Sequence, residues 1–471
     1  MSATSCSFTT ITRPDGYRQA VASSDIPAGT IVSSESSLAT VLFRSQSHRC
    51  CSFCLSSFSE DNGKRCLGGC EYNYYCSRDC QLNDFPIHKH SCKKYHKIVG
   101  NAVKEYVSER GATKLTTAET FSLHDFPWED FFLARKVYIK LCIDSNVNVK
   151  QQHSVNDVML PEEIRSLSTG EDTPNGGKEY PDEIILAAMV SASFRLDPCD
   201  SIPFFESLVC KFRCNNFGIQ NSMQTVIGHG VFPTGAKLNH SCDPNCILTY
   251  QGDKQIIRTI SKSVKEGREL FHSYTDICQP TQIRRVHLQN IYGFVCHCNR
   301  CEGKGRWKEV EDAITEQNGY SENDQMQVNR AIQTAQQISA DNVDDDMESV
   351  RREYDCLRDA LSIQKKKLGP FHLERYKTEC LALGTSMLLD GGHVVEHAEN
   401  AVKFLRYVLN KYHPLVLLQE MTLAELYIAN GKQLQGKDMI QLLIERCELS
   451  LGIEYEYIPY YRKLLDDMRG H

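Results

Sequence analysis

Eight metal-ligand side chains in residues 51–92 constrain the fold of this chain more than any other feature. They form four closely spaced pairs: Cys51-x2-Cys54, Cys66-x3-Cys70, Cys76-x3-Cys80 and His88-x3-Cys92. Four such ligands around one ion make a closed structural zinc site, so eight predict two sites. A 42-residue segment cannot bury enough apolar surface to fold alone, so bound metal would supply its folding free energy.

The distribution of the other cysteines agrees with metal binding. Nine of the 22 cysteines lie in the first 100 residues and only three follow residue 302. The N-terminus lacks a basic segment followed by an apolar one, which predicts no secretion and a cytoplasmic and nuclear protein. Disulfides are rare there, so clustered cysteines indicate metal ligands. Cys50 and His90 lie beside the pairs, and we expect neither to be a ligand.

Composition excludes several classes of protein. With 471 residues, 24% of them charged and 41% hydrophobic, the chain should fold into several domains. No apolar run is long enough to span a bilayer, so we expect no membrane partner. The net charge is −7, without a basic excess, so nucleic acid should not be the main partner. We expect a monomer.

Charge and cysteine usage both change near residue 302. Residues 1–302 hold 32 basic and 32 acidic residues, whereas residues 303–471 hold 21 and 28. Long amphipathic patterns after about residue 320 predict helices. Two similar helices follow the sequences GPFH (369–372) and YHP (412–414), whose histidines are 41 residues apart. This period favours helix-pair repeats of the tetratricopeptide type, with an irregular helical bundle as the alternative.

A second group of motifs lies between residues 239 and 301. It comprises the sequence NHSCDPNC (239–246), the segment ELFHSY (269–274) and Cys296-x-Cys298-x2-Cys301. The last motif supplies three thiolates, and either Cys242 or Cys246 could complete a tetrahedral site. Such a site would connect two segments almost sixty residues apart.

These motifs in this order resemble the SMYD family, whose members combine a SET methyltransferase domain with a MYND zinc finger. In a MYND finger the first and third pairs share one ion, and the second and fourth share the other. The resemblance therefore implies one site at Cys51, Cys54, Cys76 and Cys80 and another at Cys66, Cys70, His88 and Cys92. The second pair, CLGGC, has one residue more than the family usually has, and its two glycines should absorb it. Cys242, Cys296, Cys298 and Cys301 would hold a third zinc.

The resemblance also implies roles at the active site. Tyr274 would be the active-site tyrosine, and Phe217 and Tyr292 would line the channel for the substrate lysine. Phe217 as plain core and Tyr292 packed beneath the zinc remain alternatives. The implied contacts to S-adenosylmethionine are Gly16, Asn215 (or Asn216), Asn239, His240, Tyr274 and Phe294. We expect His272 and His287 to be surface or packing residues, and the sequence GHG (228–230) to form a turn before a strand.

The resulting fold is a multidomain α+β protein with a β-rich SET domain split by the finger and an all-helical C-terminal domain. Strands before residue 50 should pack with strands after residue 208. The expected segments are the N-terminal part of the SET domain (1–49), the finger (50–92), a helical insert (93–207), the SET core (208–276), the post-SET zinc segment (277–304) and the tetratricopeptide-like domain (305–471).

The implied function is methyl transfer from S-adenosylmethionine to a protein lysine, with three zinc ions. The acidic C-terminal region would suit basic, lysine-containing segments, including histone tails. The finger would suit proline-containing peptides. SET domains usually carry a Gly-x-Gly turn, and this chain retains only Gly16 in the sequence RPDGYRQA (13–20). The alternative is therefore a non-catalytic adaptor that binds partners through the finger and the helical repeats.

Overall fold

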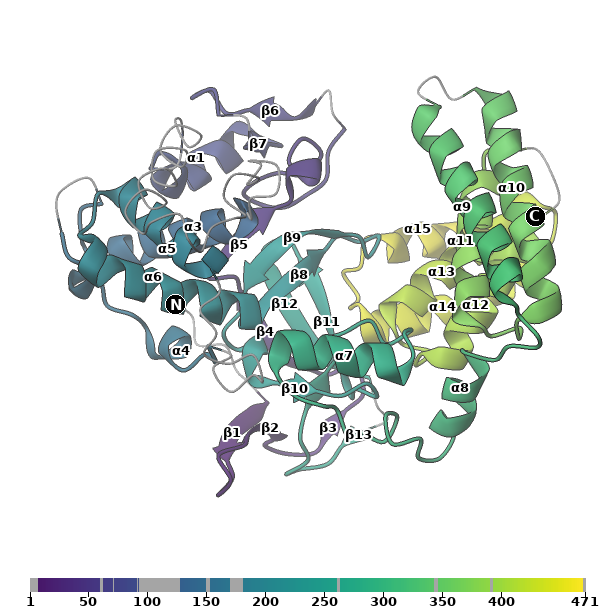
Figure 1. The fold of residues 1–471 in the computed structure, drawn as a ribbon, viewed down its shortest axis with the longest axis horizontal. Helices are drawn as coiled ribbons and strands as arrows, with labels where there is room; N and C mark the ends of the chain where they lie inside the picture. The colour runs from purple at the N-terminus through teal and green to yellow at the C-terminus, as the bar shows by residue number, and fades with distance from the viewer. Residues whose placement is uncertain are drawn as a thin grey trace.

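A computed structural model describes most of the chain. The described residues are 7–59, 62–70, 72–90, 92, 128–149, 153–169, 181–260, 263–342, 346–389 and 393–468, without the side chains of 181–185 and 198. Small sheets occupy the centre of the molecule, helices of the insert cover one side, and the C-terminal helices form a separate group on the other (Figure 1). The predicted α+β multidomain class is confirmed.

The N-terminal strands pair with strands that follow much later in the chain. β1 (Phe8–Thr12) and β2 (Arg18–Ala22) form a hairpin. β4 (Ile31–Ser36) pairs with β12 (Lys254–Thr259), which also pairs with β11 (Cys246–Gln251). β5 (Ala39–Leu42) pairs with β9 (Val226–Val231), and β3 (Ile26–Pro27) pairs with β13 (Ser263–Val264). The prediction that strands before residue 50 pack with strands after 208 is confirmed.

The finger lies between these paired strands in the sequence. After the short helix η1 (Arg44–Gln46) it contains β6 (Lys64–Arg65), β7 (Tyr74–Tyr75) and α1 (Arg78–His88). Its largest fully buried side chain, Tyr75, lies among the finger's cysteines, and its hydroxyl donates to Asp84. Among its described residues the finger therefore has almost no aliphatic core of its own, as expected of a fold that depends on metal.

The insert has a hydrophobic core of its own. α3 (Trp128–Asp144), α5 (Pro181–Phe194) and α6 (Pro198–Asn215) pack together around Phe131, Tyr138 and Phe205, with the short helices η4 (Val155–Asp157) and α4 (Glu162–Arg165) beside them. Residues 93–127, which the sequence predicts to be largely helical, lie outside the described residues. The expected boundary at residue 208 falls inside α6, because the helix continues up to the next strand.

That strand, β8 (Asn216–Gln220), pairs with β9, and β9 contains the sequence GHG. The predicted turn at 228–230 is therefore wrong: these residues form the middle of a three-stranded sheet, β5-β9-β8. The physical reason for the glycine is close packing. A Cβ on Gly228 would lie 2.1 Å from the carbonyl oxygen of Val41 on β5.

Two short strands and a helix complete the SET region. β10 (Asn239–His240) runs parallel to β14 (Phe271–His272), and α7 (Thr281–Tyr292) follows. α7 ends at Gly293, whose left-handed conformation (φ 76°) closes the helix.

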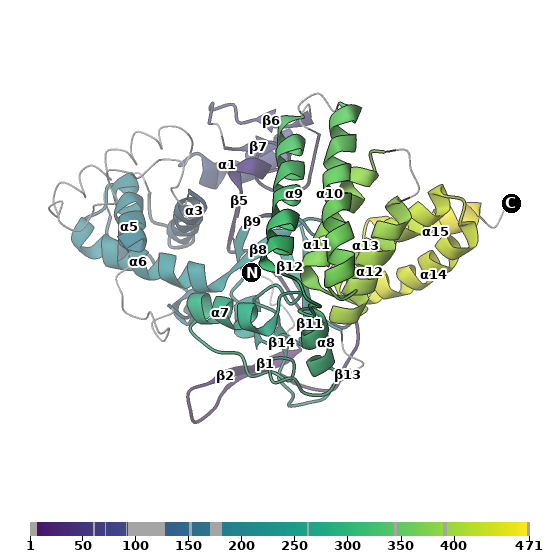
Figure 2. The same ribbon diagram turned by 45° about the vertical axis from the view of Figure 1, so that its right-hand side comes forward.

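The C-terminal region consists of α8 (Trp307–Ala313), α9 (Glu322–Asp341), α10 (Met347–Lys367), α11 (Leu373–Ser386), α12 (Val394–Val408), α13 (Pro414–Ala429), α14 (Gln433–Ser450) and α15 (Tyr457–Asp467). From α9 onward each helix packs on the next, as in helix-pair repeats, and Figure 2 shows α9 and α10 side by side. His372 and His413 are both N-caps, and their Nδ1 atoms accept from Glu374 N and Leu415 N. The 41-residue period is thus a repeated helix start.

The C-terminal helices share a core with the SET region. Leu288 of α7 and Cys278 pack in one cluster with Phe404 and Leu405 of α12. Within the described part of the chain, no helix has the length and hydrophobicity that crossing a membrane requires.

Candidate active site and metal centres

Three groups of four side chains could each hold a metal ion. They are Cys51, Cys54, Cys76 and Cys80; Cys66, Cys70, His88 and Cys92; and Cys242, Cys296, Cys298 and Cys301. In each group the ligand atoms all lie within 4.8 Å of one another. Among the described residues, Cys50, His90 and Cys246 belong to none of the groups. Cys246 packs in the core of the β region instead.

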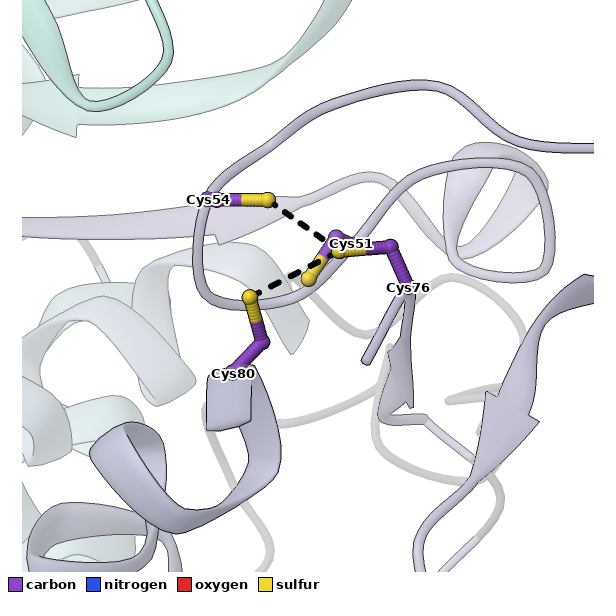
Figure 3. Close-up of side chains that lie close together, drawn as sticks. All are labelled: Cys51, Cys54, Cys76 and Cys80. Carbon is purple, nitrogen blue, oxygen red and sulfur yellow. Dashed lines mark hydrogen bonds between the residues drawn. The ribbon is translucent and has the colours of Figure 1, made fainter. Parts of the chain in front are cut away.

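The first group joins a turn, a strand and a helix of the finger. The sulfur of Cys76 lies 3.5 Å from those of both Cys54 and Cys80 (Figure 3). Cys80 enters on the first turn of α1, where the Ser77 hydroxyl accepts a hydrogen bond from its backbone N–H. The capped helix therefore carries one ligand toward the sulfurs of the preceding loop.

The second group tolerates the extra residue of CLGGC because of its glycines. The backbone N–H of Gly68 donates to the Cys66 sulfur over 3.3 Å. A Cβ on Gly68 would lie 2.2 Å from the Cys92 sulfur, and Gly69 has a left-handed φ of 75°. Only glycine suits both positions.

The third group fastens residue 242 to the segment after α7. Hydrogen bonds from the neighbouring thiols of Cys242, Cys296 and Cys301 hold the pKa of Cys298 far below its usual range. The fully buried Arg284 donates to the sulfurs of Cys242 (3.2 Å) and Cys301 (3.5 Å) and pairs with Glu311 at 2.9 Å. A buried guanidinium at this place favours thiolates, which are the metal-binding form of cysteine.

Two cavities lie on either side of the β10–β14 pair. The larger, about 940 Å³, is lined by Tyr17, Gln19, Asn239, Glu269 and Phe294 among others, and we call it the Asn239 cavity. The other, about 570 Å³, lies between the SET region and the start of α13, and we call it the Phe217 cavity. On β14, Phe271 lines the first cavity and His272 the second, as expected of successive side chains of a strand, whereas both residues of β10 line the first.

Tyr274 lines both cavities. Its ring lies 4.8 Å from Tyr292 and 4.7 Å from His272, measured between ring centroids. Its hydroxyl donates to the carbonyl of Leu238 at 2.6 Å, and burial raises the pKa of Tyr274 well above its usual range. Tyr274 is therefore a neutral hydrogen-bonding group at the junction of the cavities.

His240 connects the third metal group to this junction. Its Nδ1 accepts from the backbone N–H of Tyr274 at 2.9 Å, so in the neutral ring the proton is on Nε2. Nε2 lies 3.2 Å from the sulfur of Cys242. Burial lowers the pKa of His240 to about 3, which keeps the ring neutral. His240 lines the Asn239 cavity, but both of its nitrogens are used by the protein.

Glu269 is a site residue that the sequence reasoning missed. Its carboxylate accepts from Tyr17 Oη (3.2 Å), Gln19 Nε2 (2.5 Å) and Asn239 Nδ2 (2.8 Å). Asn239 Nδ2 also donates to the Arg18 carbonyl at 2.5 Å, which fixes the orientation of the amide. Two of the three partners of Glu269, Tyr17 and Gln19, come from the hairpin that precedes the finger, so no local spacing could reveal them.

Two predicted cofactor contacts do not line the Asn239 cavity. Gly16 lies in the β1–β2 turn at φ 83° with open space around it, and the cavity receives the side chains of Tyr17 and Gln19 instead. Asn215 lines the Phe217 cavity, and its amide donates to the carbonyls of Ser168 and Lys211. Asn239, His240, Tyr274 and Phe294 do line the Asn239 cavity.

The predicted channel residues lie together in the Phe217 cavity. Phe217 and Tyr292 line it with His272 and His287. His272 is buried against other rings and His287 is exposed, so the prediction of packing or surface residues is confirmed, and both also line the cavity. Burial raises the pKa of Tyr292 to about 12 and lowers that of His272 to about 4, so both are neutral near pH 7. The cavity wall is thus uncharged at this end.

Comparison with known proteins agrees with this arrangement. A family profile described as SET domain matches residues 18–275, more than half of the chain. The split domain, the parallel β10–β14 pair and Tyr274 between two cavities all lie within that match. The chain therefore belongs to the SET domain family.

Within this family the chain is similar to SMYD proteins. It is 24% identical over 433 residues to the N-lysine methyltransferase SMYD2-B of Danio rerio, a match that covers 88% of each chain. It is 27% identical to SMYD2 of Gallus gallus and 26% identical to SMYD2 of Homo sapiens, each over 258 residues and 55% of this chain. Those two matches span about half (52%) of the relatives' own length.

Proposed function

We propose that this protein transfers a methyl group from S-adenosylmethionine to the side chain of a lysine in another protein. The observation that carries the proposal is Tyr274, which lines both the Asn239 cavity and the Phe217 cavity. A methyl donor in the first cavity and a lysine in the second would meet at this residue. The relatives named N-lysine methyltransferases support the same reaction.

The Asn239 cavity has the chemistry that S-adenosylmethionine requires. Glu269 orients Asn239, whose amide oxygen is left to accept from an ammonium group. Phe294 offers an aromatic face for adenine, 6.0 Å from the ring of His240. S-adenosylmethionine supplies a methyl group that is already activated on a sulfonium sulfur, so the protein needs alignment more than a strong base.

The Phe217 cavity suits the side chain of lysine. A lysine amine has a pKa of about 10.4 in water and must be neutral to accept a methyl group. Phe217, Tyr292 and Tyr274 present aromatic surfaces that remove water from the ammonium, which lowers its pKa. The Tyr274 hydroxyl, held by the carbonyl of Leu238, fixes the position at which the two reactants meet.

The three cysteine-containing groups would hold structural zinc. Each has four sulfur or nitrogen ligands and no open position, which is typical of structural rather than catalytic sites. The third zinc would fix Cys242, and through His240 the backbone at Tyr274. We infer that this metal positions the active site without taking part in the reaction.

The substrates we expect are proteins with basic, lysine-containing segments, including histone tails. The C-terminal region, with a net charge of −7 over residues 303–471, borders the Phe217 cavity at Leu409, His413 and Leu415. Proline-containing peptides at the finger remain a further proposed partner, and a cytoplasmic and nuclear location remains a proposal.

Calorimetric titration of the zinc-loaded protein with S-adenosylmethionine tests the proposal without a known substrate. We expect binding that weakens about tenfold on Asn239→Ala, as one lost hydrogen bond to a charged group predicts. Asn221→Ala, in a surface turn, is the matched control and should bind as the wild type does. Absence of binding in a folded protein with three metal ions would overturn the proposal in favour of the adaptor.

A further inference from the structure

His272 has a buried nitrogen that the reaction described above does not use. The residue is 3% exposed and comes from β14, directly before the segment that carries Tyr274. Its ring centroid lies 4.7 Å from that of Tyr274 and 5.6 Å from that of Phe217. His272 thus occupies the part of the Phe217 cavity where the end of a lysine side chain would lie.

The tautomer of His272 follows from its one hydrogen bond. Nδ1 lies 3.0 Å from the carbonyl oxygen of Ser273, which can only accept, so Nδ1 carries the proton. Nε2 therefore has a lone pair. This atom is buried and has no hydrogen-bond partner among the residues that the structure describes.

An unpartnered polar atom in such a place has a cost. Leaving a buried acceptor unsatisfied destabilises a folded protein, because the desolvated atom has lost its hydrogen bonds to water. A leucine or phenylalanine of similar size would fill the same space without this cost. The histidine is explained if a ligand completes its hydrogen bond.

We propose that Nε2 of His272 accepts a hydrogen bond from the amine of the substrate lysine and limits how many methyl groups that amine receives. This inference rests on the proposed function. A neutral lysine amine has two N–H groups, a monomethylated amine has one and a dimethylated amine has none. His272 therefore holds the amine for the first two transfers and cannot hold it for the third.

His272 and Tyr274 have different roles in this proposal. The Tyr274 hydroxyl donates a hydrogen bond to the carbonyl of Leu238, and Tyr274 lies at the junction of the two cavities. Nε2 of His272 carries no proton and has no partner among the described residues, so it can bind only a group that donates a hydrogen bond. The cavity then discriminates between methylation states by hydrogen bonding as well as by width.

Nitrogen NMR of the zinc-loaded, ¹⁵N-histidine-labelled protein tests the contact directly. The resonance missing in His272→Asn identifies the residue, and its Nε2 should have the shift of an unprotonated nitrogen. n-Butylammonium, used as the lysine mimic, should move this resonance, whereas N,N,N-trimethylbutylammonium, which has no N–H, should not. A proton on Nε2, or an equal shift of this resonance with both cations, would overturn the inference.

Methylation of mixed core histones supplies the second readout, with products resolved by mass spectrometry. His272→Leu should lose about tenfold in the first two transfers, as for one hydrogen bond, and should raise the trimethylated fraction. His272→Asn retains an acceptor and should keep the wild-type product distribution. An unchanged distribution of methylation states in His272→Leu would overturn the inference.

S-adenosylmethionine binding separates the two proposals. His272→Leu should bind it with wild-type affinity, because His272 does not line the Asn239 cavity. If the wild type does not bind it, the proposed function fails, and the two amines still decide whether Nε2 is the acceptor described here.

Discussion

The hydroxyl of Tyr274 donates a hydrogen bond to the backbone carbonyl of Leu238, 2.6 Å away and 36 residues earlier in the chain. Leu238 directly precedes Asn239 and is fully buried. The bond therefore ties the tyrosine at the junction of the two cavities to the strand that carries Asn239. This hydrogen bond holds the Tyr274 hydroxyl in one position.

Tyr274→Phe should reduce turnover about 100-fold while the fold persists, because alignment contributes most to this reaction. The lost hydrogen bond should cost about 1 kcal/mol of unfolding free energy. Initial rates and thermal unfolding measure the two effects. Tyr455→Phe is the matched control, since its hydroxyl donates to the carbonyl of Ser222 away from both cavities. Equal losses of turnover in both variants would contradict the role of Tyr274.

The intact chain should bind three zinc ions, which native mass spectrometry counts. Cys301→Ser should release one ion, because it removes a ligand from the third group. Cys199→Ser should retain all three, because Cys199 is exposed and belongs to no group among the described residues. A chain that retains three ions after Cys301→Ser would disprove the assignment of that group.

Acid should destabilise the protein through His272. Burial lowers its pKa from 6.5 to about 4 in the folded chain, so below pH 6.5 the unfolded chain binds the proton first. Stability should therefore fall between pH 6.5 and pH 4, by about 3 kcal/mol from this group. His240 on the neighbouring strand and Tyr274 beside the ring stay neutral over this range.

The measurement is chemical unfolding of the wild type and of His272→Asn with zinc in excess. As the pH falls from 6.5 to 4, the wild type should lose more unfolding free energy than His272→Asn, which lacks this histidine. A difference that does not depend on pH would show that His272 is not buried in its neutral form.

A buried carboxylate should stabilise the C-terminal helices. Glu379 is 1% exposed, and it accepts from His397 Nδ1 (2.5 Å) and Asn400 Nδ2 (3.0 Å). Glu379→Ala should cost about 3 kcal/mol, because it leaves Nδ1 of the buried His397 without its partner. Glu396→Ala removes an exposed partner of Lys365 and should cost less than about 1 kcal/mol. Thermal unfolding of the two variants compares them, and similar losses would refute the network's importance.

Gly228→Ala should destabilise the central sheet by about 1–3 kcal/mol, as overpacking does. The new methyl group would meet the β5 backbone at the carbonyl of Val41. Gly384→Ala on α11 meets nothing within 4 Å and should stabilise the protein by about 1 kcal/mol. Calorimetric unfolding should therefore move in opposite directions for the two alanines, and a Gly228→Ala variant as stable as the wild type would exclude the close packing.

Local spacing was enough to predict the parts of the molecule that depend on neighbours in the sequence. Pairs such as Cys51 and Cys54 follow from spacing, because a short turn points two sulfurs at one place, whereas the resemblance to the SMYD family implied which pairs form a group of four. The helix starts at His372 and His413 follow in the same way, because a cap and its helix are adjacent in the chain.

Tertiary structure alone decided the contents of the two cavities. Tyr17 and Glu269 form a hydrogen bond although 252 residues separate them in the chain. Asn215 lines the Phe217 cavity and not the Asn239 cavity, and its amide donates to the carbonyl of Ser168 in the insert. The sequence GHG is a strand because Val41 lies against it, and His272 is a cavity residue because β10 and β14 pair. Spacing along the chain was enough to predict the ligand pairs and the starts of α11 and α13. Which side chains line the two cavities depends on how distant strands pair. A shift of the pairing register by one residue would move every side chain of a strand to the opposite face of the sheet.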